Sequence, residues 1–396
     1  MKHRLSRSFT AVSLIGLAAM LGCSSGTDTS DGASSGGDGA TGGPTGATQA
    51  ASSTGSATAS SGATTGSGAG GSGAGGAGSG GAAGEGGSGG TPAPKPVRLL
   101  VIGDTGEGNS EQHCVADAMD KKCELLGGCD AVVMTGDNFY DHGVQSVSDA
   151  QWMSKFELPY DRPHLNGLKF YVVLGNHDYG ATSNGNKGAQ IAYSKLPVGS
   201  GPGQRYSDKW TMPASYYDVA LGEGTVHLFG IDTQDTGTTQ LDDMKQRVAK
   251  STAAWKIVFG HHPRYTSGEH QLDNTLVDTL TKLTSPPGMF ALQEGIYCGA
   301  DLYLTGHDHN REVIDKGMDG ACPNVPFIIS GAGAKVRPSK YPKLGKSLYY
   351  DEGVEGFLYF ELTKSSFRVE SYDMAPSDCA GAGAKAPKFT YGPLAK

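Results

Sequence analysis

Seven short apolar runs, each followed by a glycine and then small or polar residues, are the strongest constraint on how this chain can fold. In chain order they are VRLLVIGDTG, CDAVVMTGDN, KFYVVLGNHD, TVHLFGIDTQ, WKIVFGHHP, DLYLTGHDHN and VPFIISGAG. Their Val, Ile, Leu, Phe and Tyr content is typical of strands that are buried on both faces. Helix-like stretches such as SEQHCVADAMDKKCELL and TQLDDMKQRVAKS lie between several of them. Strands that alternate with helices predict an α/β fold with a largely parallel sheet.

The residues that follow five of these runs are of the kinds that bind metals. They are, in chain order, Asp104, Asp137, Asn176, His177, His261, His307 and His309. In open α/β sheets ligands bind beyond the carboxyl ends of the strands, so these side chains are expected to lie together. The preceding glycines allow the backbone to turn sharply and to approach a ligand closely. Five strand ends that carry only oxygen and imidazole donors indicate a metal site rather than chance turn chemistry.

The chemistry of these groups indicates two metal ions. Mixed oxygen and nitrogen donors without cysteine suit zinc, iron and manganese better than calcium. Seven candidate ligands are too many for one tetrahedral ion and suit two ions that share a carboxylate. Two ions about 3.5–4 Å apart can clamp a phosphoryl group and lower the pKa of a bridging water. Their positive charge would allow a chain of net charge −8 to bind an anionic substrate.

The motifs GDTG, GDNFY, GNHD, GHHP and GHDH resemble those of the calcineurin-like metallophosphoesterases, and most closely those of the purple acid phosphatases. The small, tartrate-resistant type is the most similar, because GDNFYDHGVQSVSD, GNHDYG, AQIAYSK, GHDHN and SGAGA all read like its segments. The likeness extends roughly over residues 97 to 373, in order and at similar spacing. It implies an α/β sandwich in which two central, mostly parallel or mixed β-sheets are flanked by helices.

The resemblance also implies which residue binds which metal. Many relatives have a histidine where this chain has Gly106, and here Tyr140 would supply the missing ligand. The first metal, Fe(III), would be bound by Asp104, Asp137, Tyr140 and His309. The second metal, Fe(II), Zn or Mn, would be bound by Asp137, Asn176, His261 and His307, with Asp137 bridging the two. A trication would stabilise the phenolate of Tyr140, and charge transfer from phenolate to iron gives the family its colour.

Two further histidines are catalytic candidates by the same resemblance. His177 follows Asn176, and His270 lies nine residues after His261. Their implied role is to bind phosphate and to protonate the leaving alcohol, with a surface loop histidine as the alternative for His270. Asp178 and Asp308 either orient ligand histidines or serve as turn residues.

The other polar residues near the motifs are assigned no role in the site. Asp232 ends a strand without matching a ligand motif, so it is read as structural. His113, His164 and His227 have no motif context. His142 and His262 are neighbours of site residues, and relatives often have an aromatic residue at the position of His262.

The N-terminal part of the chain has the features of an exported protein. Residues 1–22 combine a basic start with a short apolar stretch, as in a signal peptide, and end before Cys23 as in a bacterial lipoprotein. An ordinary secretory signal is the alternative to a lipidated Cys23. Residues 23–96 are rich in Gly, Ser, Ala and Thr and predict a disordered tether. Residues 97–396 would form one metallophosphoesterase domain. The expected location is a bacterial membrane reached through the lipid anchor, or otherwise the periplasm or the medium.

The remaining cysteines and the charge pattern narrow the choice of partners. Six cysteines in an exported chain favour disulfides among 15 possible pairings, and a zinc cluster is the weaker alternative because no CxxC pair occurs. They are Cys114, Cys123, Cys129, Cys298, Cys322 and Cys379. No run of Lys and Arg was found, which argues against nucleic acid as a partner.

The leading hypothesis is a phosphomonoesterase with two metals, in which a metal-bound hydroxide attacks phosphorus and a small-molecule phosphate ester is the substrate. One alternative is a phosphodiesterase of the same superfamily. Another is a tethered surface binding protein with a relic metal site, and a third is redox chemistry at exposed iron. The sequence favours the enzyme because every ligand position is filled and both candidate proton donors are present.

Overall fold

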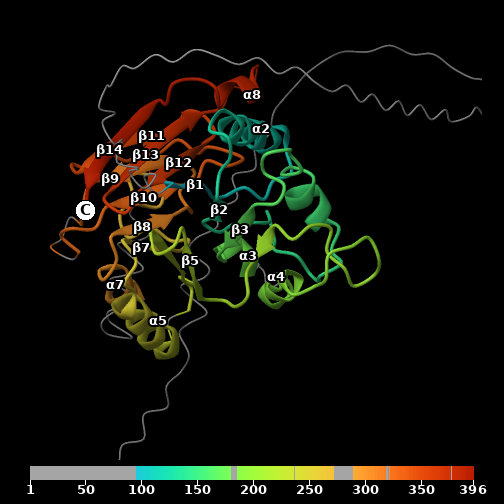
Figure 1. Cartoon of the computed structure of the whole chain (residues 1–396), viewed down its shortest axis with the longest axis horizontal. Helices are drawn as coiled ribbons and strands as arrows, with labels where there is room; N and C mark the ends of the chain where they lie inside the picture. The colour runs from blue at the N-terminus through green and yellow to red at the C-terminus, as the bar shows by residue number, and fades with distance from the viewer. Residues whose placement is uncertain are drawn as a thin grey trace, which may run out of the picture. The chain divides into compact units, whose positions relative to one another are not determined.

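Two seven-stranded β-sheets form the frame of the folded region in the computed structural model (Figure 1). The structure describes residues 95–179, 185–235, 237–271, 289–317, 320, 322–375 and 377–396. All of these residues belong to one compact unit. The predicted signal peptide and the predicted tether up to residue 94 lie outside the described residues, and so does Cys23.

The first sheet has the strand order β14-β13-β12-β1-β2-β3-β4. Its strands are β1 (Val97–Ile102), β2 (Ala131–Met134), β3 (Lys169–Val172), β4 (Trp210–Thr211), β12 (Gly356–Leu362), β13 (Ser366–Asp373) and β14 (Phe389–Ala395). β1 to β4 are parallel to one another. β12 pairs with β1, β13 with β12 and β14 with β13, and each of these three pairs is antiparallel. The first three predicted runs therefore supply three of the four strands in the parallel half of this sheet.

The second sheet has the strand order β11-β9-β10-β8-β7-β6-β5. Its strands are β5 (Tyr217–Leu221), β6 (Val226–Gly230), β7 (Trp255–Phe259), β8 (Leu302–Thr305), β9 (Arg311–Ile314), β10 (Phe327–Ser330) and β11 (Ser347–Asp351). The other four predicted runs are β6, β7, β8 and β10, which are parallel neighbours. β5, β9 and β11 are antiparallel to their partners.

Helices cover the outer faces of both sheets. The described helices are α2 (Ser110–Leu125), α3 (Asn176–Tyr179), α4 (Lys187–Ser194), α5 (Thr238–Lys250), α7 (Met289–Tyr297) and α8 (Cys379–Ala382), with a π-helical turn η1 (Met153–Glu157). α5 and α7 lie together beside the second sheet, and α2 lies beside α8 at the first (Figure 1). Both helix-like stretches of the sequence are confirmed as α2 and α5. A search of the described residues finds no helix with the length and hydropathy of a membrane span.

The continuous apolar runs follow from burial on both strand faces. In β7, Ile257 and Phe259 pack into the core between the sheets, whereas Val258 packs into a second core that includes Met244 and Val248 of α5. Each of these five side chains is at most 1% exposed. A strand with water on one face would alternate polar and apolar residues, so the runs report a sheet covered on both sides.

The strand and helix pattern taken alone was wrong about the sheet. It predicted one largely parallel sheet, and the structure has two mixed ones, as the family resemblance implied. The pattern missed the antiparallel edges because these strands are more exposed or lack the glycine ending. Tyr217–Leu221, for example, contains one exposed and three half-buried residues. The α/β sandwich fold class is confirmed.

The six cysteines form three disulfides, as predicted. Cys114 pairs with Cys379, Cys123 with Cys129 and Cys298 with Cys322, at Cα–Cα distances of 4.6, 5.3 and 4.7 Å. The first bond joins α2 to α8 across 265 residues of sequence. Stable disulfides are typical of exported proteins, which agrees with the N-terminal sequence features.

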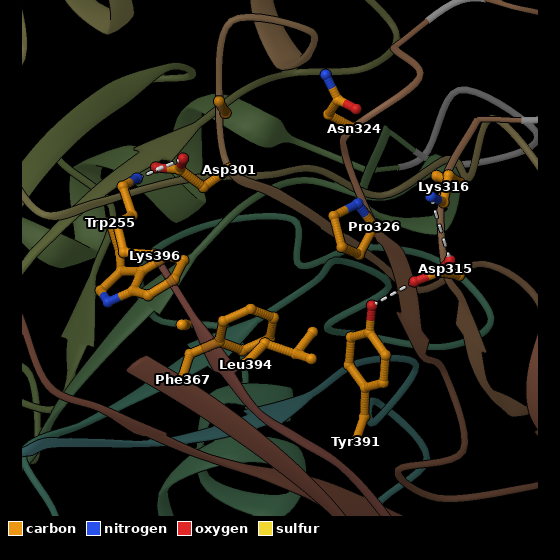
Figure 2. Close-up of a pocket in the computed structure, with 12 residues that line it drawn as sticks. Trp255, Asp301, Asp315, Lys316, Asn324, Pro326, Phe367, Tyr391, Leu394 and Lys396 are labelled. Atoms are coloured by element: carbon orange, nitrogen blue, oxygen red, sulfur yellow. Dashed lines mark hydrogen bonds and ion pairs between the residues drawn. The ribbon is translucent and has the colours of Figure 1, made fainter. Parts of the chain in front are cut away.

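A pocket of about 400 Å³ opens at the amino ends of the second sheet's parallel strands (Figure 2). Trp255 begins β7, and Pro326 precedes β10. Phe367 and Tyr391 of the first sheet complete its apolar floor. The predicted metal ligands follow the opposite ends of the same strands, so this pocket is separate from the candidate site.

Candidate metal centre

All seven predicted ligands lie together where the carboxyl ends of the two sheets meet. Asp104, Asp137, Tyr140 and Asn176 follow β1, β2 and β3 of the first sheet. His261, His307 and His309 follow β7 and β8 of the second sheet. Neither sheet holds the complete set, so the site depends on the packing of one sheet against the other.

The hydroxyl of Tyr140 is the centre of the first group of side chains. It lies 3.0 Å from Oδ1 of Asp104, 3.0 Å from Oδ2 of Asp137 and 3.0 Å from Nε2 of His309. Nε2 of His309 is also 3.6 Å from Oδ1 of Asp104. Two carboxylates, a phenol and an imidazole therefore direct one donor atom each to the same point.

The second group of side chains contains Asn176, His261 and His307. Oδ1 of Asn176 lies 3.0 Å from Nε2 of His261 and 3.0 Å from Nδ1 of His307, and the two nitrogens are 3.2 Å apart. Nε2 of His261 is 3.4 Å from Oδ1 of Asp137. Asp137 thus directs one oxygen to each group, as a bridging carboxylate must.

The spacing of these atoms fits two metal ions. Ligand atoms about 2.1 Å from one ion lie roughly 3.0–3.4 Å from one another in octahedral or tetrahedral geometry. The separations of 3.0 to 3.6 Å in both groups fall close to that range. Nδ1 of His261 lies 2.9 Å from the carbonyl oxygen of Thr135, to which it can donate a proton. This bond leaves the lone pair of Nε2 directed into the site, the arrangement typical of a metal-binding histidine.

The backbone at three of these residues adopts the left-handed region. Asp104, Asp137 and His307 have φ angles of 56°, 51° and 71°. Side chains other than glycine rarely adopt this region, and it is concentrated at functional sites. Each of the three directly follows a glycine, and a Cβ on Gly175 would lie 2.1 Å from Oδ1 of Asp137. The glycines of the motifs therefore make room for the ligands.

Gly106 explains why a tyrosine can occupy the first group. A Cβ at this position would lie 2.3 Å from the backbone nitrogen of Phe139, so no side chain fits. The amide of Tyr140 donates to the carbonyl of Gly106 at 2.8 Å. The segment that carries Tyr140 thus fills the space next to position 106, where a relative with a histidine at that position would place its side chain.

Burial and mutual charge set the protonation of the cluster. Burial raises the pKa of Asp104 well above its usual range, and the Asp137 carboxylate adds to that rise. Burial would lower the pKa of His261, but the Asp137 carboxylate raises it to about 9. Burial also holds the pKa values of His307 and His309 well below their usual range, so these two imidazoles stay neutral. His307 and His309 are thus already in the neutral form that binds a metal, whereas a bound cation would displace the protons of Asp104 and His261.

His177 and His270 flank the two groups. The ring of His177 lies 4.5 Å from that of Tyr140, and its Nδ1 is 2.7 Å from the carbonyl oxygen of Asp141. The ring of His270 stacks on that of His307 at 4.2 Å. Both side chains therefore stand beside the cluster.

The adjacent acids position loops. Asp178 is buried and accepts hydrogen bonds from the backbone amides of Asn138 and Gly175. Asp308 accepts from the backbone amide of His270 at 3.0 Å and from the hydroxyl of Thr266. These two residues thus hold the loop segments next to the site. The sequence had left open whether they orient ligand histidines or serve as turn residues.

The remaining polar residues of the motifs lie outside the two groups. Asp232 accepts from Tyr179 and from the backbone of Gln234, which is the structural role expected of it. His164 lies 3.3 Å from Asp120, and His227 lies 2.8 Å from Asp218.

The sequence underestimated two features of the site. His262, which was given no role, lies with its ring 4.5 Å from that of His307, and its Nδ1 is 2.7 Å from the hydroxyl of Thr233. Burial lowers its pKa to about 3, so it is a neutral neighbour of the second group. Lys335 lies with its ammonium 4.1 Å from the centroid of the Tyr140 ring. Its distance of almost two hundred residues from Tyr140 in the sequence gave no signal of this contact.

Comparison with known protein families identifies similar sequences over most of the folded region. A family model described as calcineurin-like phosphoesterase matches residues 97–311. Purple acid phosphatase 7 of Arabidopsis thaliana is 32% identical over 307 residues, which cover 70% of this chain and 82% of that protein. Tartrate-resistant acid phosphatase type 5 of Rattus norvegicus is 28% identical over 309 residues, covering 69% of this chain and 85% of that protein.

Solved structures share the fold. GAP50, described as the anchor in the inner membrane complex of Plasmodium, aligns with a TM-score of 0.57 and 24% identity, covering 76% of this chain and 90% of its own. A purple acid phosphatase from yellow lupin (Lupinus luteus) seeds aligns with a TM-score of 0.54 and 16% identity, covering 75% of this chain and 53% of its own. At these identities the likeness concerns the fold alone.

Proposed function

This chain belongs to the calcineurin-like phosphoesterase family and is of the purple acid phosphatase type, and we propose that it hydrolyses phosphate monoesters with two metal ions. The observation that supports this best is the Asp137 carboxylate, which directs one oxygen to each of two donor groups. When bound there, two ions would neutralise the charge of a phosphoryl group and lower the pKa of a water.

The residues of each group would divide the metals between them. Fe(III) is proposed as the first ion because its ligands would include two carboxylates and a phenol, in the set Asp104, Asp137, Tyr140 and His309. The second ion, Fe(II), Zn or Mn, would be bound by Asn176, His261 and His307, with Asp137 shared. Asn176 is neutral, so this second group has less negative charge and suits a divalent ion.

His177 and His270 would bind the phosphate and protonate the leaving alcohol. Nδ1–H of His177 can donate to the carbonyl of Asp141, which fixes the ring, and Nε2–H of the protonated ring would donate to an ester oxygen. Asp308 holds the backbone of His270, and the stacking on His307 sets the plane of the His270 ring. A histidine held in this way can protonate the departing alcohol.

The test combines metal analysis, a visible spectrum and two esters. The purified full-length chain should contain two metals with iron among them, show a visible band and hydrolyse p-nitrophenyl phosphate faster than bis(p-nitrophenyl) phosphate. Tyr140→Phe should lose the band while the fold is kept, since the change removes only the oxygen. A band that survives in Tyr140→Phe would contradict the ligand assignment, and faster diester turnover would favour a phosphodiesterase.

A binding protein with a relic metal site is the second candidate, because one protein of similar fold is described as an anchor. The seven donor positions and both flanking histidines are occupied in this chain, which favours the enzyme. A relic site would bind less than one metal per chain and would hydrolyse neither ester.

The proposed location is the surface of a bacterial membrane, with lipidation of Cys23 and the stretch 23–96 as a tether. The wild type should fractionate with membranes, whereas Cys23→Ser should be released or remain unprocessed. Identical soluble behaviour of the two proteins would contradict lipidation.

A further inference from the structure

The segment that follows β10 brings two cations to the metal centre. The ammonium of Lys335 lies 4.1 Å from the ring centroid of Tyr140. The backbone amide of Arg337 donates to the carbonyl of His309 at 3.2 Å. The Lys335 ammonium thus adjoins one of the residues proposed to bind the first metal, and the backbone of Arg337, two residues later, adjoins another.

Backbone and side-chain hydrogen bonds fix this segment in place. The side chain of Asn109 donates to the carbonyl of Ala334 at 2.9 Å. The side chain of Gln271 donates to the carbonyl of Pro342 at 3.1 Å, and the amide of Leu344 donates to the hydroxyl of Ser267 at 3.0 Å. The segment thus lies along residues 267–271, which carry His270. The backbone is therefore anchored on both sides of the two cations.

Both cations are available to a ligand. Lys335 pairs with Glu107, with side-chain exposures of 34% and 24%. Nε of Arg337 lies 3.2 Å from Oε2 of Glu269, with exposures of 42% and 44%. Ion pairs this exposed contribute little to stability, so an anionic group can replace the glutamate at small cost. A guanidinium also binds carboxylate and phosphate through two parallel hydrogen bonds.

We propose that Lys335 and Arg337 form a second anion subsite beside the metal centre, which selects phosphate esters that carry a further carboxylate or phosphate near the scissile phosphate. This inference rests on the proposed function. The scissile phosphate would occupy the centre between the ligand groups, and the additional anion would reach the two cations at its edge. The additional anion would take the place of Glu107 and Glu269 beside Lys335 and Arg337.

The test compares two inhibitors that differ by one carboxylate. Methylphosphonate and phosphonoacetate would be measured as competitive inhibitors of p-nitrophenyl phosphate hydrolysis at one ionic strength. In the wild type, phosphonoacetate should bind at least about tenfold more tightly, the effect of one charge-assisted hydrogen bond. Lys335→Met and Arg337→Met should each remove most of this advantage, and Lys335→Arg should keep it.

Lys316→Met is the matched control. Lys316 is an exposed lysine that lies 3.7 Å from Asp315, in the pocket at the opposite ends of the strands (Figure 2). The same loss of charge there should leave both inhibition constants unchanged. Equal loss of the advantage in Lys316→Met, or its retention in both Lys335→Met and Arg337→Met, would overturn the subsite. A wild type that does not hydrolyse the ester would instead overturn the proposed function, and the subsite with it.

Discussion

The acidic side chains at the two ends of the parallel strands differ in how they are paired. At the amino ends, around the pocket of Figure 2, each acid has partners of its own. Asp301 accepts from Lys396 at 2.5 Å, and Asp315 accepts from Tyr391 at 2.6 Å. At the carboxyl ends, Asp104 and Asp137 are at most 1% exposed and share their partners.

Strand β9 connects the two environments. Glu312, near its start, is fully buried and accepts from the amide of Ser267 at 2.8 Å, whereas Asp315, just beyond its end, lies in the pocket with its side chain 38% exposed. The amino ends are satisfied without any ligand. At the carboxyl ends, the oxygen and nitrogen lone pairs directed into the site outnumber the protons that can be shared among them. A bound cation would compensate for that excess of lone pairs. The acids at the amino ends are therefore ordinary paired surface groups, whereas those at the carboxyl ends have the character of a binding site.

The largest expected effect is that of His261→Ala. Removal of this ligand should empty the second metal site and lower turnover by roughly a thousandfold or more, since a bound ion contributes several kcal/mol to transition-state stabilisation. Metal analysis and p-nitrophenyl phosphate turnover check this together. His307→Ala should behave alike. Two metals per chain with normal turnover in either variant would contradict the assignment.

The central strands and most of the proposed ligands could be predicted from the sequence, because both are encoded by residues close together in the chain. The seven apolar runs identified the central strands. The residue directly after a glycine identified five of the seven proposed ligands, and His309 lies two residues further on in the motif GHDH. Tyr140 required the family resemblance, since a tyrosine three residues after Asp137 is also a common core residue. The structure shows the reason for its position in the Gly106 backbone, which leaves space for no side chain.

The rest depended on contacts between distant segments. Lys335 reaches Tyr140 through the packing of one sheet on the other, and Asp308 reaches His270 between the loops that follow two neighbouring strands of the second sheet. The cations from Lys335 to Lys346 are separated by other residues, so no basic run was visible. Sequence spacing predicts which residues share a strand end, whereas the rim of the site is set by loops that return to it.

The second effect concerns His270→Ala. Loss of the proton donor should leave both metals bound and slow alkyl phosphates by about 10²-fold or more, because a basic leaving oxygen needs a proton. The loss should be much smaller for p-nitrophenyl phosphate, whose leaving group is stable as an anion. Measured turnover of the two esters decides. Equal losses would indicate that His270 binds phosphate and does not protonate the leaving group.

The third effect is on stability. Burial raises the pKa of Glu312 from 4.5 in the unfolded chain to about 7 in the folded one. A raised carboxyl pKa favours the protonated form, so its contribution to stability is full below pH 4.5 and is lost as the pH rises to 7. At most, roughly 3 kcal/mol is involved. Glu312→Gln, which mimics the protonated form, should raise the melting temperature at pH 8 and leave it little changed at pH 4.5.

Asp315→Asn is the control for Glu312→Gln, because Asp315 lies just beyond the other end of β9. Its side chain is partly exposed and paired, so the melting temperature should change less than in Glu312→Gln at pH 8. A larger change in Asp315→Asn would mean that burial does not distinguish the two ends.

The smallest effect compares two tyrosines that both donate to aspartate. The hydroxyl of Tyr391 donates to Asp315, as that of Tyr140 does to Asp104 and Asp137. Tyr391→Phe should cost about 1 kcal/mol of folding free energy, the net value of one hydrogen bond, because the freed carboxylate can turn to water. Metal content, colour and turnover should stay those of the wild type, whereas Tyr140→Phe, the same chemical change, should lose the colour. Chemical denaturation and a visible spectrum of both variants make the comparison. A fall in metal content in Tyr391→Phe would show that the two ends of the strands are coupled, and that the pocket helps to hold the site.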